Sequence, residues 1–263
     1  MFTDLFLFCV VLISNLIIGV LLGMTGISGF LLPLIYVGFL VMPVHDSLAL
    51  SFLSFAVSGI IGAYSYWKSK NMDLKLALYL SIGSLPGAFM GVQINVLISD
   101  FLAKLLLYIF ILIAGLSILL RKNNRNAERQ SKILNNHLAV IMIGLITAAV
   151  CSLTGAGGPI LLVPLLASLG VNIRVAVGVS LLNSVVIAIP SIFGYFAHAS
   201  MGNLTMLIIA SLIGTIVGIL IGAHFANKVP IHHMKLFIAI ITILSSMYML
   251  ISLVLSFGHL SFT

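Results

Sequence analysis

Two short glycine-rich segments are the parts of this sequence best suited to chemistry. They read TGISGF at residues 25–30 and TGAGGP at residues 154–159, and each interrupts a long apolar stretch. Glycine tolerates backbone angles that other residues avoid, and it lets a ligand approach the bare backbone. If a helix begins after each segment, its free amide groups and the positive end of its dipole favour an anion. The two segments therefore predict a binding site for a small anion.

Other polar residues in and after these segments extend the candidate site. Thr25, Ser28 and Thr154 stand where they can cap the following helices, and Pro159 suits a first helical turn. The stretch LALSFLSF carries two serines one helical turn apart, and VGVSLLNS carries a serine and an asparagine at the same spacing. These groups can donate hydrogen bonds to an oxyanion or bond between helices. The predicted substrate-binding residues are Thr25, Gly26, Ser28, Gly29, Ser51, Ser54, Thr154, Gly155, Gly157, Gly158, Pro159, Ser180 and Asn183.

The composition indicates the medium in which these segments must fold. Hydrophobic residues make up 62% of the chain and charged residues 6%, and the mean hydropathy is +1.30. Such a chain cannot present a wettable surface on all sides. The formal net charge of +7 lies in loops, so it does not point to nucleic acid. The sequence predicts an all-α, polytopic protein in contact with the lipid bilayer.

The apolar segments fall into two sets of five. The first set covers residues 5–22, 30–42, 47–66, 74–97 and 101–120, and the second covers 138–153, 159–170, 175–197, 204–226 and 232–256. The segment 5–22 lacks the basic start and cleavage site of a signal peptide, so we expect it to be retained. In each set a segment of about 12 residues follows the glycine-rich motif, short of the roughly 20 needed to span a membrane. We therefore expect a hairpin that stops part-way or a broken helix at each motif.

The two halves of the chain repeat one another. The TG pair at residue 25 precedes the TG pair at residue 154 by 129 positions, and Ser51 precedes Ser180 by the same offset. Further along the offset is 131, and three glycines spaced four apart recur: Gly83, Gly87 and Gly91 match Gly214, Gly218 and Gly222. Such ordered coincidences indicate an internal duplication, and the spaced glycines favour tight helix packing. We expect a repeat 1 at residues 1–120, a cytoplasmic linker at 121–136 and a repeat 2 at 137–263.

The distribution of basic residues predicts the orientation of these repeats. The linker 121–136 carries five Lys or Arg residues against one Glu, which places it in the cytoplasm by the positive-inside rule. Counting segments outward from the linker places both termini outside the cell. Equivalent loops of the two halves then face opposite sides of the membrane, as in the inverted-topology repeats of secondary transporters. Each repeat should contain one broken or hairpin helix pair and three transmembrane helices.

Few ionisable residues lie within the apolar segments, which restricts the chemistry. His224 is the one candidate proton carrier, and it can equally be an interfacial residue beside Lys228. No Walker lysine follows the glycines, and TGISGF does not fit a G-x-S-x-G nucleophile pattern. We expect no catalytic residue, no metal site and no cofactor. An intramembrane enzyme or a non-transporting membrane subunit is the alternative to a transporter.

The motifs also carry a family resemblance. The stretches GMTGISGFLLPL and SLTGAGGPILLVPLL, followed by LSFLS and VSLLNS, resemble the sulfite exporter TauE/SafE family of bacterial membrane permeases. The first motif carries Ser28 where the second has Gly157, and Phe30 where the second has Pro159. The resemblance runs from about residue 10 to about residue 256.

This resemblance implies a carrier of small sulfur-containing anions in the bacterial inner membrane. Sulfite, thiosulfate, sulfonates and sulfoacetate are the substrates it implies, driven by the proton gradient or the membrane potential. Other small anions, such as carboxylates, are the alternative substrates. The direction of transport, a coupling proton and a homo-oligomeric state stay open at this point.

Overall fold

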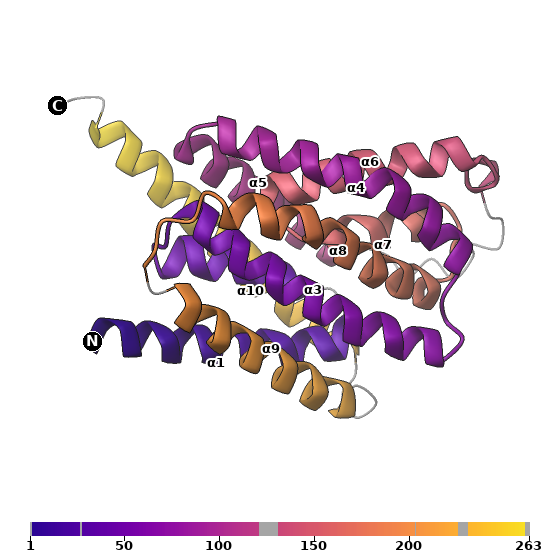
Figure 1. The fold of residues 1–263 in the computed structure, drawn as a ribbon, viewed down its shortest axis with the longest axis horizontal. Coiled ribbons are helices and arrows are strands. Elements are labelled where there is room, and N and C mark those ends of the chain that lie inside the picture. The colour runs from indigo at the N-terminus through magenta and orange to yellow at the C-terminus, as the bar shows by residue number, and fades with distance from the viewer. Residues whose placement is uncertain (1, 27, 121–130, 203, 226–230, 261–263) are drawn as a thin grey trace.

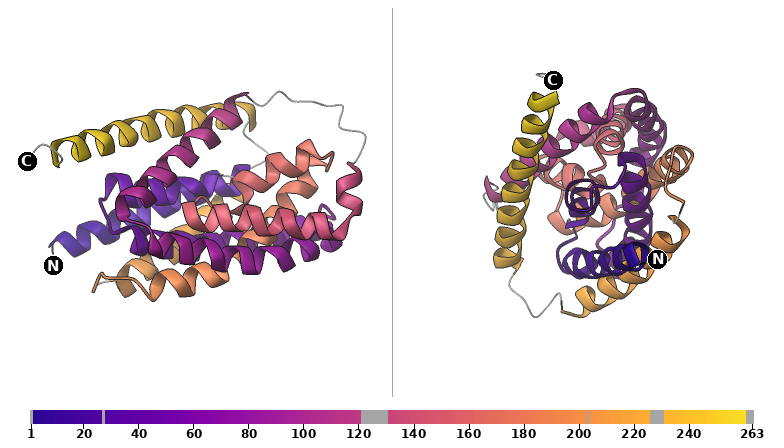
Figure 2. Two further views of the ribbon diagram at one scale, coloured as in Figure 1. Left: turned by 90° about the horizontal axis from the view of Figure 1, so that it is seen from above. Right: turned by 90° about the vertical axis from the view of Figure 1, so that its left-hand side faces the viewer.

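The structure is a computed structural model that describes residues 2–26, 28–120, 131–202, 204–225 and 231–260. Within these ranges the chain is helical and forms no strand, which confirms the all-α fold class. Figures 1 and 2 show long helices lying side by side in one bundle, with the first and the last described residues at the same end of the bundle. Residues 121–130 of the expected linker lie outside the described residues.

Eight helices in the described part of the chain are long and apolar enough to cross a membrane. They are α1 (Phe2–Thr25), α3 (Val44–Lys68), α4 (Leu74–Leu97), α5 (Asp100–Leu120), α6 (His137–Thr154), α8 (Ile173–Phe196), α9 (Leu204–Phe225) and α10 (Ile231–Leu260). The shorter elements are η1 (Ser28–Phe30), α2 (Leu31–Pro33), η2 (Leu34–Phe39), η3 (Lys132–Asn135) and α7 (Gly158–Ser168). The expected polytopic membrane protein is confirmed, and most expected segments match a helix closely.

Polar side chains fix where the helices begin at the ends of the bundle. The carboxylate of Asp73 accepts a hydrogen bond from the amide of Leu76 at 3.0 Å, at the start of α4. The side-chain carbonyl of Asn172 accepts one from the amide of Arg174 at 2.9 Å, at the start of α8. Both are ordinary N-caps, which satisfy amide groups that the first helical turn leaves without an acceptor.

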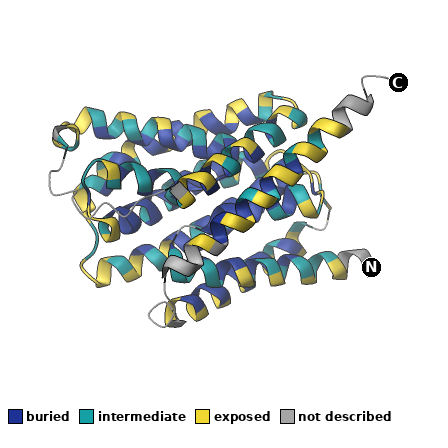
Figure 3. Ribbon diagram, turned by 180° about the vertical axis from the view of Figure 1, so that it is seen from behind, coloured by how far each residue is buried: buried dark blue, intermediate teal, exposed yellow. Residues whose placement is uncertain are grey.

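The outer surface of the bundle is apolar and several polar side chains lie inside it. Leu85 and Phe89 on α4 and Leu220 on α9 are more than half exposed, while Asn15 on α1 and Ser211 on α9 are fully buried. Figure 3 shows exposed residues along the outward faces of the long helices. In water such an extended apolar surface would drive association, so its natural environment is the hydrocarbon of a membrane.

The two halves of the chain pack in the same pattern, with their roles exchanged. Helix α1 of the first half lies along α9 of the second half, and α6 of the second half lies along α4 of the first. Helices α3 and α8, which are equivalent to each other, pack together, as do α5 and α10. A duplicated chain with an internal two-fold relation produces this exchange. The inverted orientation of the repeats in the bilayer stays a prediction.

The glycines spaced by four residues create the closest of these helix contacts. A Cβ atom added to Gly87 of α4 would lie 2.2 Å from the carbonyl oxygen of Leu145 on α6. The matching Gly218 of α9 would place a Cβ 2.4 Å from the carbonyl oxygen of Leu16 on α1. Both distances are too short for any side chain, so these glycines serve backbone-to-backbone packing, as the sequence predicted.

Candidate functional site

Both glycine-rich motifs form the tips of helical hairpins. We call residues 25–26 and 28–30 the first tip and residues 154–159 the second tip. In the first hairpin the side-chain amide of Asn15 on α1 donates to the hydroxyl of Tyr36 on η2, so the returning segment runs alongside α1. In the second hairpin the amide of Ser131 before α6 donates to the carbonyl of Leu169 after α7 at 2.9 Å. Of the two expected alternatives, a hairpin and a broken helix, the structure therefore has a hairpin at each motif.

The return segments are short, so the tips lie inside the bundle. Helix α7 has 11 residues and rises about 16 Å, roughly half the thickness of a hydrocarbon core. Gly26 and Gly155, at equivalent positions, have φ angles of 75° and 72° in the left-handed region. Only glycine adopts this conformation without strain, which explains its occurrence at both turns.

The two tips meet around one small cavity. The cavity has a volume of about 10 Å³ and is lined by Gly29 and Phe30 of the first tip and by Ala156, Gly157 and Pro159 of the second. A space of this size holds about one water molecule. The hairpins therefore converge in the protein interior, but the space between them is closed to an oxyanion in this conformation.

The ring of Phe55 on α3 separates the two tips. A Cβ added to Gly29 would lie 2.9 Å from Cε1 of this ring, and a Cβ added to Gly157 would lie 3.1 Å from its Cε2. Phe55 is 4% exposed and also lines the cavity. Sequence reasoning did not select Phe55, because a phenylalanine among other apolar residues carries no signal of its position.

The carbonyl groups that end α6, just before the second tip, have side-chain partners. The side-chain amide of Asn95 on α4 donates to the carbonyl of Leu153 at 2.7 Å. The hydroxyl of Tyr195 on α8 donates to the carbonyl of Ser152 at 2.6 Å. The last carbonyls of a helix have no partner within the helix. These side chains therefore supply hydrogen bonds that the end of α6 would otherwise lack.

The amide groups at the start of α7, in contrast, have no capping side chain. The N-cap residue Gly157 has φ 75°, no side chain caps this terminus, and Pro159 occupies the first turn as expected. Gly158 begins the helix, and a Cβ there would lie 3.2 Å from Cβ of Ser184. A helix start of this kind offers amide donors and a positive dipole end, so the second tip is suited to an anion.

The prediction that Thr154 caps the helix after it is wrong, since no side chain caps the start of α7, whereas the matching prediction for Thr25 stays a prediction. The hydroxyl of Thr25 donates to the carbonyl of Leu21 at 2.7 Å, and that of Thr154 donates to Val150 at 2.7 Å. Threonine at the end of a helix readily bonds back to the carbonyl four residues earlier. The donor of the Thr154 hydroxyl is therefore directed into α6 and away from the second tip.

The first tip differs from the second in its backbone. Ser28 and Gly29 are buried in the single 3-10 turn η1, which continues into a three-residue α-helical turn and the π-helix η2. Ser28 Oγ lies 3.5 Å from Oγ1 of Thr25. The dipole of an irregular segment is smaller than that of a regular helix. The second tip is therefore the stronger of the two for an anion.

Two of the predicted serines lie outside the space between the tips. Ser51 Oγ donates to the carbonyl of Ser47 at 2.7 Å, and Ser180 Oγ donates to that of Ala176 at 2.6 Å. Both residues are fully buried, and neither lines the cavity. Their matching bonds support the duplication more than they support a role in binding.

Ser54 belongs to a buried polar cluster centred on Asn15. The side-chain oxygen of Asn15 accepts from Ser54 at 3.0 Å, from Ser211 at 3.4 Å and from Thr215 at 3.1 Å. The cluster joins α1, α3 and α9, and sequence reasoning missed its centre. An asparagine inside the apolar segment 5–22 was the available signal, because polar residues at membrane depth need partners.

Asn183 lies buried without a hydrogen-bond partner. Asn183 is 0% exposed, and neither its side-chain nitrogen nor its side-chain oxygen makes a hydrogen bond. Two further serines, Ser58 on α3 and Ser184 on α8, line the cavity between the tips. They were missed although each stands four residues after a selected position, Ser54 or Ser180, on the same helix. Both lie nearer the tips than Ser51 and Ser180. Their hydroxyls donate to the carbonyls of Phe55 at 3.1 Å and Leu181 at 2.7 Å, so each must turn away from its own helix to bond an anion.

The residues that line the cavity between the tips include no Asp, Glu, Lys, Arg or His. His224 lies in the last turn of α9 with an exposed side chain, so its proposed role in proton coupling has no support from burial. Across the described residues, no group of three or more His, Cys, Asp or Glu side chains could hold a metal ion. Any anion bound between the tips would therefore be held by neutral groups.

An all-helical bundle with an apolar exterior and two hairpins meeting inside it defines a polytopic membrane protein of the transporter type. The family described as "Sulfite exporter TauE/SafE" matches residues 11–249, and the chain belongs to this family. The family is one of membrane transporters and not of enzymes, which confirms the sequence-based resemblance.

Two proteins of Bacillus subtilis (strain 168) are similar to this chain. One, "Probable membrane transporter protein YdhB", is 24% identical over 225 residues, or 84% of this chain and 91% of the relative. The other, "Probable membrane transporter protein YjnA", is 25% identical over 255 residues, or 90% of this chain and 97% of the relative. No solved structure matches the chain.

Proposed function

We propose that this membrane transporter moves a small sulfur-containing oxyanion or organosulfonate, which binds where the two hairpin tips meet. The observation that carries the proposal is the shared cavity between Gly29 and Gly157, two glycines from opposite halves of the chain. Paired helix breaks are not needed for packing alone, because the glycines on α4 and α9 already provide close packing without a break. A convergence of two tips therefore favours a ligand site.

Neutral donors would hold the anion. The amides at the start of α7 have no capping side chain, and the hydroxyls of Ser58 and Ser184 line the cavity. Each hydroxyl donates to an anion by releasing the carbonyl that it bonds within its own helix. Removing an anion from water without an opposing charge is costly. Preorganised amides and hydroxyls offset that cost only in part, so we expect a modest affinity, which suits a carrier that must also release its substrate.

Transport would proceed by alternating access. The cavity in this conformation is too small for an oxyanion, so the tips must separate for the anion to enter or leave. The exchanged packing of α1 with α9 and of α4 with α6 supports a duplication into repeats at residues 1–120 and 137–263, and inverted repeats of this kind alternate between two arrangements in secondary transporters. We place the protein in the bacterial inner membrane with both termini outside, and we expect the proton gradient or the membrane potential to drive it.

The proposal is tested by anion uptake into liposomes that contain the purified protein. A panel of sulfite, thiosulfate, sulfoacetate, taurine and small carboxylates is offered with and without a pH gradient. We expect saturable uptake of at least one sulfur-containing anion and little uptake of carboxylates. If carboxylates alone move, the substrate class is wrong, and if only cations move, the proposed site is wrong.

A further inference from the structure

The route from the tips to one end of the bundle is filled by stacked aromatic side chains. We call this the Asp46 end, where α3 begins and α8 ends (Figure 1). The ring of Phe55 packs edge-on against Phe52 at 5.4 Å between centroids, and Phe52 stacks on Tyr195 at 5.8 Å. Tyr195 in turn stacks on His45 at 6.0 Å. Phe52 and Tyr195 are fully buried, so no open path passes between them.

The carboxylate of Asp46 closes the same end of the bundle. Asp46 is 0% exposed and lies in the first turn of α3, in the first half of the chain. It accepts hydrogen bonds from the amide of Ser200 at 3.1 and 3.2 Å, from the hydroxyl of Ser200 at 3.0 Å and from the amide of Met201 at 3.1 Å. These bonds to a carboxylate side chain join the first half to the α8–α9 loop of the second half.

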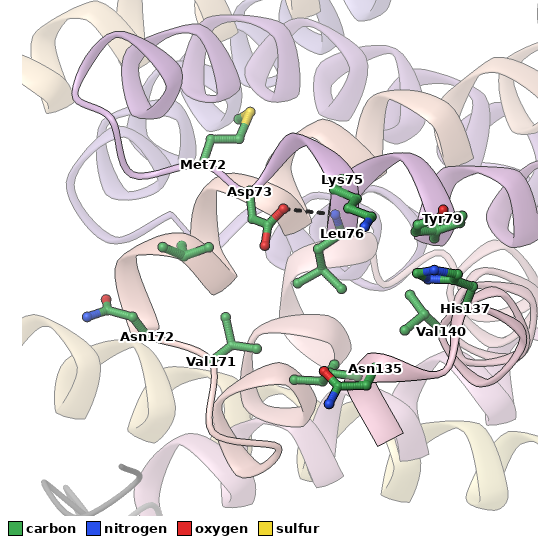
Figure 4. A pocket seen from close by; sticks show the side chains of 12 residues that line it. Met72, Asp73, Lys75, Leu76, Tyr79, Asn135, His137, Val140, Val171 and Asn172 are labelled. Atoms are coloured by element: carbon green, nitrogen blue, oxygen red, sulfur yellow. Dashed lines mark hydrogen bonds between the residues drawn. The ribbon is translucent and has the colours of Figure 1, made fainter. Parts of the chain in front are cut away.

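The opposite end of the bundle has a different construction. A cavity of about 560 Å³ opens there between the starts of α4, α6 and α8, and Lys75, Tyr79 and His137 are among its lining residues (Figure 4). We call this the Lys75 end. Val175, which lies 129 positions after Asp46 and corresponds to it in the second half of the chain, lines this cavity. The two equivalent positions therefore differ: Asp46 holds one end of the bundle closed, whereas Val175 borders an open cavity at the other end.

The two ends also differ in the kind of contacts found there. An apolar cluster that includes Leu80, Leu162 and Leu166 borders the large cavity. Leu162 and Leu166 belong to α7, the short return helix of the second hairpin. Apolar contacts are non-directional and reform easily, whereas four hydrogen bonds to a buried carboxylate define one geometry. The Asp46 end is thus the specifically closed one.

We infer that the bonds from Asp46 to the loop of Ser200 and Met201, together with the stack of Phe52 and Tyr195, form a gate that closes the Asp46 end of the anion pathway. This inference rests on the proposed function, since it assigns the gate to the pathway that leads to the tips. The gate opens when the carboxylate releases the loop and Tyr195 moves away from Phe52. By the predicted orientation this is the extracellular gate.

A native cysteine can report the opening without any knowledge of the substrate. Cys151 is fully buried beside the second tip, and its Sγ donates to the carbonyl of Gly157 at 3.2 Å. Cys9 is exposed and is replaced by serine, which leaves Cys151 as the single thiol. A charged, membrane-impermeant thiol reagent is then applied from each side of the membrane in sealed vesicles. A separate Ser99→Cys variant, in a background without other cysteines, shows on which side the Asp46 end lies, because Ser99 is exposed at that end.

Asp46→Ala should raise the rate of Cys151 labelling from the Asp46 end by roughly tenfold or more, as expected for the loss of charge-assisted hydrogen bonds. Ser200→Ala, which removes one of the four bonds, should raise it less and from the same side. Asp73→Ala is the matched control, since it removes an exposed helix-capping carboxylate at the Lys75 end, and it should leave that rate unchanged.

The inference is overturned if Asp46→Ala and Ser200→Ala leave the rate unchanged, or if they raise it equally from both sides. If Asp46→Ala does not yield a folded protein in detergent, the Ser200→Ala result decides alone. The labelling rate involves no anion. A gate can therefore be found when the substrate class is wrong, and it can be absent when anion uptake is observed.

Discussion

The ring of Phe55 lies so close to Gly157 that a methyl group on this glycine would sit 3.1 Å from the ring. Gly157 also has φ 75° and ψ 153°, a conformation that is essentially confined to glycine and costs an L-residue about 1–3 kcal/mol. The two constraints act on the same residue, at the start of the helix whose amides are proposed to hold the anion.

Gly157→Ala should therefore lower anion uptake at least roughly tenfold, because strain of this size displaces the tip. The protein should still fold and insert, since only one tip is disturbed. Gly202→Ala is a suitable control, as a Cβ at Gly202 meets nothing within 4 Å. Uptake in liposomes and the elution profile in detergent measure the two effects. Full uptake by Gly157→Ala would remove the second tip from the mechanism.

Asn183 should contribute to function at the expense of stability. Its buried amide has no partner, and a buried polar group without a hydrogen bond costs about 1–3 kcal/mol. Asn183→Leu should thus raise the free energy of unfolding by about 1 kcal/mol or more while anion uptake falls. Thermal unfolding and uptake, measured on the same preparation, give both numbers.

Asn15→Leu provides the contrast, because the side-chain oxygen of Asn15 accepts from Ser54 and Thr215. Its removal leaves buried hydroxyls without their acceptor, so the free energy of unfolding should fall by about 1–3 kcal/mol. If Asn183→Leu and Asn15→Leu change stability in the same direction, the distinction between the two asparagines is wrong.

The packing of α4 on α6 should fail when Gly87 carries a side chain. Gly87→Ala places a methyl group 2.2 Å from the carbonyl oxygen of Leu145, and backbone atoms cannot move aside as side chains do. We expect a loss of about 1–3 kcal/mol or more in stability. Gly115→Ala meets only side-chain atoms of Ile243 and Thr242, at 3.0 Å and beyond, and should be tolerated. Equal thermal stability of the two variants would contradict the packing account.

The helices and hairpins follow from properties that act along the chain. Apolar runs long enough to span a membrane predict α3, α4 and the other long helices, because lipid cannot satisfy free backbone groups. The duplication, visible in the pairs around Gly26 and Gly155, predicts that two equivalent breaks exist. It also predicts that glycines such as Gly87 and Gly218 serve equivalent helix contacts.

The partners of individual polar side chains depend on the other half of the chain and could not be predicted. Ser54 bonds to Asn15 of α1 and to Ser211 of α9, and neither neighbour can be read from the sequence around Ser54. Thr154 bonds back within its own helix, because a carbonyl four residues earlier is always within reach. The position of Phe55 between the tips likewise appears only after α3 has packed against both hairpins.

The central claim is that a small oxyanion binds between the tips, and the direct measurement is an X-ray structure of the protein with selenite, the heavier analogue of sulfite. Anomalous scattering from selenium marks its position without reference to any transport assay. We predict a peak within hydrogen-bonding reach of the amides that begin α7 and of Ser58 or Ser184. A peak found only elsewhere, such as in the cavity beside Lys75, would contradict the account.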